Sequence, residues 1–280
     1  MNHIARIVAM FLIAQLIGLF VGIQLIGNPE QYGNPNVTPN QQSADVGNSV
    51  IFILYVVTVA VIVILIIKYF KWAPFLFKAL ELFTVFVTST IVFVVFFAYL
   101  RVPYAYELSF VLSILLVALK FFYPRIKNAT AIISSAAVGA LFGFSFDIVP
   151  TLIFVAMLSL YDFVAVFITK HMVYMAKEMS KMDLSFSVSS RERRYVKEKK
   201  KEEEFSVELG SGDIAIPLML AVSAYKISYS MMDSFAVVLG SSIGLVLVLY
   251  YVTRKRVFLP ALPPLCFFGV LFLGLARLLH

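Results

Sequence analysis

Nine apolar stretches, each close to the length of a membrane-spanning helix, dominate this sequence of 280 residues. About 20 apolar residues cross the hydrocarbon core of a bilayer, and lipid offers no partner for open backbone groups, so each stretch is predicted to be a helix. The chain is 61% hydrophobic, whereas a soluble domain is about 45–50% apolar. The predicted spans are Ile7–Gly27, Ser49–Ile67, Phe75–Leu100, Ala105–Phe122, Asn128–Phe146, Val149–Thr169, Gly210–Ile227, Ser234–Val252 and Pro260–Leu279. The predicted fold class is therefore all-α, a polytopic membrane protein with nine transmembrane helices.

The charges between these stretches predict how the helices are oriented. If nine spans alternate in direction, 20 of the Lys and Arg residues fall on one side and 3 on the other. Cytoplasmic connections carry the excess of Lys and Arg, so the N-terminus is predicted to be cytoplasmic and the C-terminus outside. The net charge of +7 is then explained by topology rather than by nucleic-acid binding. We expect an integral multi-pass protein of the cell (plasma) membrane.

One long charged connection divides the chain into three parts. Residues 1–169 carry the first six spans, residues 170–209 form the connection, and residues 210–280 carry the last three spans. The connection holds ten basic and eight acidic residues. Such a composition predicts a solvated cytoplasmic loop, whose first part, 171–182, could continue the sixth helix.

Two aspartates lie inside apolar stretches. Asp162 is in the sixth predicted span, and Asp213 is the fourth residue of the seventh. A carboxylate at bilayer depth is costly, so an intramembrane Asp is by default a functional-site hypothesis. Asp162 lies about seven residues, or roughly 10 Å, from the inner end of its span. Both side chains are thus predicted at the cytoplasmic side, where antiparallel neighbouring helices can place them together.

Backbone-altering residues surround the same depth. Gly210 and Gly212 precede Asp213, and Pro217 follows it by one turn. These residues predict a loosened start to the seventh span, although small residues also simply permit tight helix packing. Three prolines within 260–264 are expected to prevent regular helix at the start of the ninth span.

Two close carboxylates cannot easily both ionise, so the pair can share a proton. The charged member can then act as a general base on water, and the neutral member as a general acid on a peptide carbonyl. This is aspartic protease chemistry, which needs neither metal nor cofactor. A proton or cation channel or transporter could use the same pair, and depth and pairing alone support both readings equally.

Three short motifs separate these alternatives. They are Tyr161-Asp162 in the sixth span, Gly210-Ser211-Gly212-Asp213 at the start of the seventh, and Pro260-Ala261-Leu262 at the start of the ninth. In this order and in these spans, they resemble the presenilin and signal-peptide-peptidase group of intramembrane aspartyl proteases. The motifs match that group's YD, GxGD and PAL patterns, and the resemblance covers the whole chain.

The resemblance implies an intramembrane aspartic endopeptidase that hydrolyses peptide bonds within transmembrane helices. Asp162 and Asp213 would be the catalytic dyad. Residues that would shape the site or contact substrate are Tyr161, Gly210, Ser211, Gly212, Pro260, Ala261 and Leu262. The implied partners are membrane-protein substrates and the lipid bilayer, with no nucleic acid and no cofactor. Accessory subunits, a homo-oligomer and self-cleavage of the 170–209 connection stay open. The predicted orientation is that of the presenilin-like branch. With a modest 170–209 connection and no long polar N-terminal tail, the chain resembles a compact microbial (archaeal) homologue.

Other polar residues are assigned simpler roles. His3, His171 and His280 are scattered and suggest no metal site. The single cysteine, Cys266, is expected to be a small buried or lipid-facing residue. Glu81, Glu107, Asp147 and Asp233 lie near predicted span ends and are interpreted as interfacial.

Overall fold

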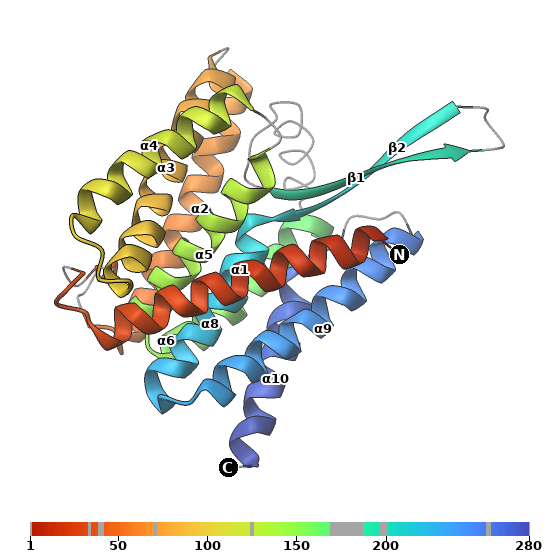
Figure 1. Ribbon diagram of the computed structural model, residues 1–280. Coiled ribbons are helices and arrows are strands. Elements are labelled where there is room, and N and C mark those ends of the chain that lie inside the picture. The colour runs from red at the N-terminus through yellow and green to blue at the C-terminus, as the bar shows by residue number, and fades with distance from the viewer. Residues whose placement is uncertain are drawn as a thin grey trace.

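The computed structural model describes residues 2–32, 35–38, 42–69, 72–123, 126–168, 187–196, 201–255 and 259–279. Within these ranges every predicted apolar stretch forms an α-helix, and the helices assemble into one bundle (Figure 1). The elements are α1 (Asn2–Gly27), α2 (Val46–Tyr69), α3 (Ala73–Tyr99), α4 (Ala105–Phe122), α5 (Lys127–Ser145), α6 (Ile148–Phe163), η2 (Val164–Ile168), β1 (Ser187–Val196), β2 (Lys201–Gly210), α8 (Ser211–Ser228), α9 (Met231–Lys255) and α10 (Leu262–Leu278).

Most of these helices have the character of membrane spans. In the described part of the chain, 7 helices are long and apolar enough to cross a membrane, by length and composition. They are α1 to α6 and α9. Large apolar side chains such as Leu54, Phe83 and Phe110 point outward from this bundle. An apolar exterior of this kind is suited to lipid rather than to water, which agrees with the predicted polytopic membrane protein.

Helix α8 forms the centre of the bundle. Its residues from Ile214 to Ala224 are all buried, and the helix packs against α1, α5, α6, α9 and α10. A helix enclosed by protein needs no lipid-facing stripe, and α8 also carries Asp213 and Lys226. Neighbouring helices, rather than lipid, therefore surround most of α8.

Glycines permit the close approach of α8 to α5. A Cβ atom added at Gly139 would lie 2.7 Å from the Ala215 carbonyl oxygen, and one at Gly143 would lie 2.8 Å from the Met219 carbonyl oxygen. The spacing of four between these glycines is the small-residue pattern that lets helix backbones meet in membranes. Gly18 and Gly22 of α1 repeat this spacing against Leu218 and Val222.

The charged connection contains a β-hairpin. β1 and β2 pair antiparallel, from Ser187 opposite Gly210 to Val196 opposite Lys201. Over these residues the connection is thus a hairpin rather than an irregular loop. At the hairpin base Val188 and Leu209 are buried in a cluster with residues of α1, α5, α8, α9 and α10. Residues 169–186, including the predicted continuation of the sixth helix, lie outside the described residues.

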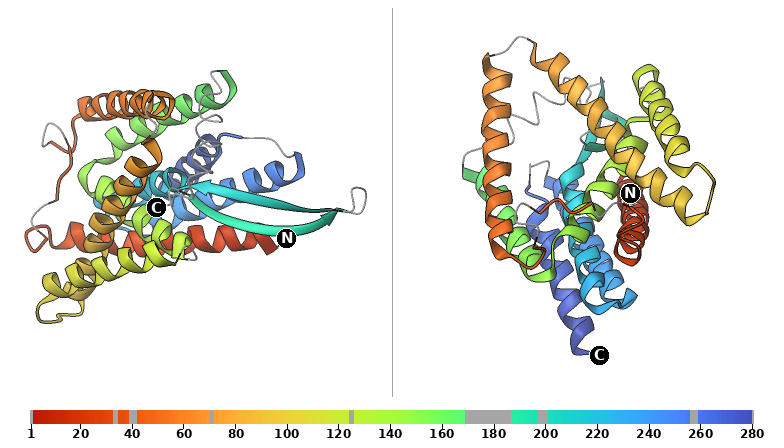
Figure 2. Two further views of the ribbon diagram at one scale, coloured as in Figure 1. Left: turned by 90° about the horizontal axis from the view of Figure 1, so that it is seen from above. Right: turned by 90° about the vertical axis from the view of Figure 1, so that its left-hand side faces the viewer.

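The hairpin marks the end of the bundle at which α1 begins (Figure 1). The same buried cluster joins Val188 and Leu209 of the hairpin to residues near the starts of four helices, namely Ile7, Ala131, Ile214 and Leu265. In Figure 2 the strands extend away from the helices, while α2 and α4 lie on opposite flanks of the bundle. The starts of α1, α5, α8 and α10 thus meet at one end.

Three of the acidic residues interpreted as interfacial form ion pairs. Glu81 is only 1% exposed and contacts Lys120 of α4 and Lys78. Asp147 bonds Lys226 at 2.7 Å, and Asp233 bonds Arg277 at 3.3 Å. Glu81 is thus enclosed by protein between α3 and α4, where its partners offset the cost of burying a carboxylate. Glu107 is exposed.

Candidate active site

Helices α6, α8 and α10 pack against one another in pairs. Each carries one of the three sequence motifs. Asp162 lies in the last turn of α6, Asp213 in the first turn of α8, and Leu262 begins α10. The packing therefore gathers residues separated by 100 positions in the sequence at the hairpin end of the bundle.

Asp162 is enclosed by protein and held by the main chain. Asp162 is 3% exposed, and its carboxyl accepts a hydrogen bond from the backbone N–H of Leu262. That N–H is available because the first N–H groups of a helix have no partner within the helix. The start of α10 thus orients the carboxyl of α6.

The backbone changes form directly after Asp162. Helix α6 ends at Phe163 and continues as a π-helical turn, Val164–Ile168. π-helical turns are rare, and they occur frequently at functional sites. By contrast, α8 runs without a break through Pro217. The irregular turn therefore follows the first aspartate, whereas the predicted loosening around the second is not seen as a break in the helix.

Asp213 is held by the start of its own helix. Gly210 is the N-cap residue of α8, and its backbone N–H donates a hydrogen bond to the Asp213 carboxyl. A side chain three residues after the N-cap that bonds back to the cap N–H is one half of a capping box. A Cβ at position 210 would lie 3.2 Å from Asp213 Oδ2. Glycine therefore fits this position closely.

The two carboxyl groups are neighbours. Asp162 acts electrostatically on Asp213, although the two residues come from separate helices. Asp213 is partly exposed, as is Ser211, and Gly212 is exposed. The two carboxyl groups thus interact where α6 meets the partly exposed first turn of α8.

The Pro260–Leu262 segment forms one wall of the site. Pro260 is buried and precedes α10, and Ala261 is its N-cap residue. Pro263 and Pro264 then occupy the first turn, where proline's missing N–H costs no helical bond. Of the predicted span from Pro260, only Pro260 and Ala261 therefore lie outside the helix at its start.

An apolar cluster supports the two aspartates. Leu262 packs in it with residues of α5, α6 and α8, and the partly buried Tyr161 lies against it. Tyr161 is also within electrostatic reach of Asp162. The other members are Phe146, Phe154, Val155, Leu158, Ile216, Met219 and Cys266.

Cys266 lies closer to the aspartates than the sequence suggested. It is buried, and both Asp162 and Asp213 act on it electrostatically. The spacing of four from Leu262 places both side chains on one face of α10, which is the signal that could have linked Cys266 to the site. Its expected role as a small buried residue is confirmed.

Gly212 is placed differently from Gly210. A Cβ at position 212 would meet no atom within 4 Å, so no contact of this structure explains glycine there. Among the described residues no group of three or more His, Cys, Asp or Glu side chains could hold a metal ion.

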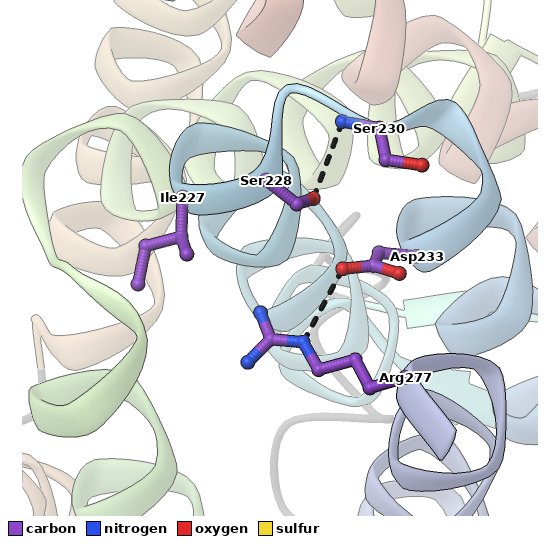
Figure 3. Close-up of a pocket in the computed structure, with 5 residues that line it drawn as sticks. All are labelled: Ile227, Ser228, Ser230, Asp233 and Arg277. Atoms are coloured by element: carbon purple, nitrogen blue, oxygen red, sulfur yellow. Dashed lines mark hydrogen bonds and ion pairs between the residues drawn. The ribbon is translucent and has the colours of Figure 1, made fainter. Parts of the chain in front are cut away.

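A separate cavity of about 310 Å³ lies at the opposite end of α8. Figure 3 shows its lining residues, Ile227, Ser228, Ser230, Asp233 and Arg277, with the Asp233–Arg277 ion pair crossing it. Ile227 follows Asp213 by 14 residues of helix, about 21 Å along its axis. This cavity is therefore not part of the aspartate site.

Comparisons with known proteins agree with this geometry. The model of the family described as "Signal-peptide peptidase, presenilin aspartyl protease" matches residues 8–272. No curated protein sequence matches the chain.

Solved structures show the same fold. A presenilin family intramembrane aspartate protease in space group C222 has a TM-score of 0.73 and 21% identity, covering 99% of both chains. A structure of a presenilin family intramembrane aspartate protease in space group P2 has a TM-score of 0.69 and 21% identity, covering 98% of this chain and 96% of the other. Because the family model spans nearly the whole sequence, this chain belongs to the signal-peptide peptidase and presenilin family of intramembrane aspartyl proteases.

Proposed function

We propose that Asp162 and Asp213 are the catalytic dyad with which this protease hydrolyses peptide bonds inside transmembrane helices. The observation that carries the proposal is the convergence of the two carboxyl groups, from α6 and α8, within electrostatic reach of each other. Two structural ion pairs elsewhere, Asp147–Lys226 and Asp233–Arg277, show how this chain normally neutralises acidic residues. Asp162 and Asp213 instead interact electrostatically with each other.

The proposed reaction follows from the chemistry of a carboxyl pair that shares one proton. The charged carboxylate removes a proton from a water molecule, and that water attacks the scissile carbonyl while the neutral carboxyl donates a hydrogen bond to the carbonyl oxygen. The backbone N–H groups of Leu262 and Gly210 each bind one carboxyl group. They hold the two groups in orientation while protons move between them and the substrate.

We expect water to enter from the hairpin end, where the first turn of α8, at Ser211 and Gly212, is partly exposed. With 20 of 23 Lys and Arg residues on one side, the charge distribution supports nine spans with this end in the cytoplasm. Helix α8 has 18 residues, about 27 Å of helix, which is close to the thickness of the hydrocarbon core. Cleavage of a single-span substrate is then expected near the cytoplasmic end of its helix. We place the enzyme in the plasma membrane, and its orientation assigns it to the presenilin-like branch.

The proposal is tested by proteolysis in reconstituted vesicles that contain a single-span substrate. Asp162→Asn and Asp213→Asn keep the size of each side chain but remove its acid–base function. General acid–base groups contribute about 10²- to 10⁴-fold to rate, so each variant should lose at least about 100-fold. Asp147→Asn is the matched control, because Asp147 is ion-paired at the other end of the bundle. Substantial cleavage by either dyad variant would disprove the assignment.

A further inference from the structure

Gln15 is a fully buried amide in the middle of the apolar helix α1. Its exposed fraction is 0%, and its neighbours Phe11 and Ala14 belong to the buried apolar cluster at the hairpin end. Burying an amide without full hydrogen bonding costs several kcal/mol in an apolar medium, about 4–8 by transfer to cyclohexane. An apolar residue of the same size would fill this place without that cost, so the amide calls for a specific explanation.

The amide of Gln15 contacts the residue next to Asp213. Gln15 Nε2 donates a hydrogen bond of 2.8 Å to the carbonyl oxygen of Ile214, a residue 199 positions away in the sequence. Because a carbonyl can only accept, the orientation of the amide is fixed by this bond. Helix α1 thus holds the main chain of α8 in the turn that carries the aspartate.

That turn needs support from outside its own helix. In a regular helix the N–H of residue 217 would bond to the carbonyl of Asp213, and Pro217 has no N–H. The first turn of α8 therefore lacks one hydrogen bond at the aspartate itself. The bond from Gln15 to Ile214 supplies a tie from another helix at the adjacent carbonyl.

The second polar atom of Gln15 adds to the cost of burying this amide. Gln15 Oε1 is buried and has no hydrogen-bond donor among the described residues. A buried acceptor without a partner is destabilising, and replacing a partly satisfied polar group with an apolar group of similar shape can be neutral or stabilising. The stability cost and the location beside Asp213 together point to a role in function.

We propose that Gln15 is a positioning residue, which fixes the first turn of α8 and so holds Asp213 at the distance from Asp162 that hydrolysis requires. The inference rests on the proposed function of the dyad. Gln15 acts through the backbone of Ile214 and touches neither the reacting water nor the scissile bond.

Gln15→Met tests this role, because it keeps the volume and helix propensity of the side chain while removing the donor. Displacing a catalytic group by about 1 Å can cost about 100-fold in rate. We expect kcat to fall by at least about tenfold, KM to stay within about twofold, and the unfolding temperature in detergent to be unchanged or higher. A purely structural role instead predicts a lower unfolding temperature with kcat unchanged in the folded enzyme.

Ser234→Ala is the matched control. The buried Ser234 of α9 donates a hydrogen bond of 2.9 Å from Oγ to the carbonyl of Ala221, so it is also a buried tie to the main chain of α8. Ala221 lies eight residues beyond Asp213, and kcat of this variant should stay within about twofold of wild type. Gln15→Asn is a second test, since its shorter side chain keeps an amide that falls short of Ile214, and kcat should again fall.

The outcomes separate the two proposals. If Asp213→Asn abolishes cleavage while folded Gln15→Met and Gln15→Asn keep the wild-type kcat, this inference is overturned and the dyad stands. An equal fall in kcat for Ser234→Ala would also overturn it, because the fall would then not depend on how far the lost hydrogen bond lies from Asp213. Retained cleavage in Asp213→Asn would overturn the proposed function itself.

Discussion

At the residue scale, backbone N–H groups at two helix starts orient the proposed dyad. Gly210 binds Asp213 within one turn, and Leu262 binds Asp162 across 100 residues of sequence. Free N–H groups at helix starts are ready donors to carboxylates. Truncating a side chain does not remove a main-chain donor. The orientation of the two carboxyl groups therefore depends on the backbone conformation at the proline-rich start of α10 and at the glycine before α8.

A first prediction compares the two glycines of the Gly210–Asp213 motif. Gly210→Ala places a methyl group 3.2 Å from Asp213 Oδ2, so the carboxyl must shift by a few tenths of an ångström. Scaling from about 100-fold for 1 Å, we expect kcat to fall by about three- to tenfold.

Gly212→Ala is the control for stability, since its methyl group meets nothing within 4 Å. Its unfolding temperature in detergent should match that of the wild type. A lower unfolding temperature for Gly212→Ala, or an unchanged kcat for Gly210→Ala, would contradict the geometry described for this turn.

At the element scale, α8 is held between the glycine faces of α1 and α5. Gly139→Ala would place a methyl group 2.7 Å from the carbonyl oxygen of Ala215, so the two backbones would have to separate. Overpacking of this kind costs about 1–3 kcal/mol. Thermal unfolding in detergent should show this variant to be less stable than wild type.

Gly274→Ala in α10 serves as the opposite case. No atom lies within 4 Å of its added methyl group, and Ala is favoured over Gly inside a helix by roughly 1 kcal/mol. This variant should be as stable as wild type or more stable. Equal destabilisation by both substitutions would argue against close packing of α5 on α8.

A polar side chain of α5 also attaches the hairpin to the bundle. Asn128 donates from Nδ2 to the Ser189 carbonyl at 2.8 Å and accepts from the Ser189 N–H at 3.0 Å, as a neighbouring strand would. Asn128→Ala should therefore speed hydrogen exchange of the Ser189 amide by about five- to tenfold, as expected for losing about 1 kcal/mol of hydrogen bonding.

Thr130→Ala provides the comparison for that measurement. The Thr130 hydroxyl bonds only to carbonyls of its own helix region, those of Ile126 and Lys127, so exchange at Ser189 should be unchanged. Faster exchange at Ser189 in Thr130→Ala would show that the strand responds to α5 as a whole rather than to Asn128.

At the scale of the whole molecule, the helices can be predicted from the sequence, whereas the contacts between them cannot. Long apolar stretches predicted each helix, because lipid-compatible segments have few alternatives to helical structure. The spacing of three between Gly210 and Asp213 also matches a helix start, whereas the glycines and Pro217 favoured a loosened one. Links between distant segments, such as Leu262 to Asp162 and Gln15 to Ile214, leave no local pattern.

The hairpin was missed for a different reason. Nearly half of its strand residues are charged, and the apolar Val188 and Leu209 are buried at its base. Charge runs usually indicate solvated segments. Two apolar residues next to such runs are therefore not enough to predict strands that attach to the bundle. The tertiary contacts of those two residues with the helix starts, rather than strand propensity, anchor the hairpin.

The central claim is that the carboxyl groups of α6 and α8 work as one unit. The most direct test is the single-turnover rate of substrate cleavage in wild type, Asp162→Asn, Asp213→Asn and the double variant. Groups that act as a unit show strongly non-additive losses, so each single variant should fall to the same residual rate as the double variant. A single variant that keeps a rate within about tenfold of wild type, or a double variant far below both single variants, would contradict this account.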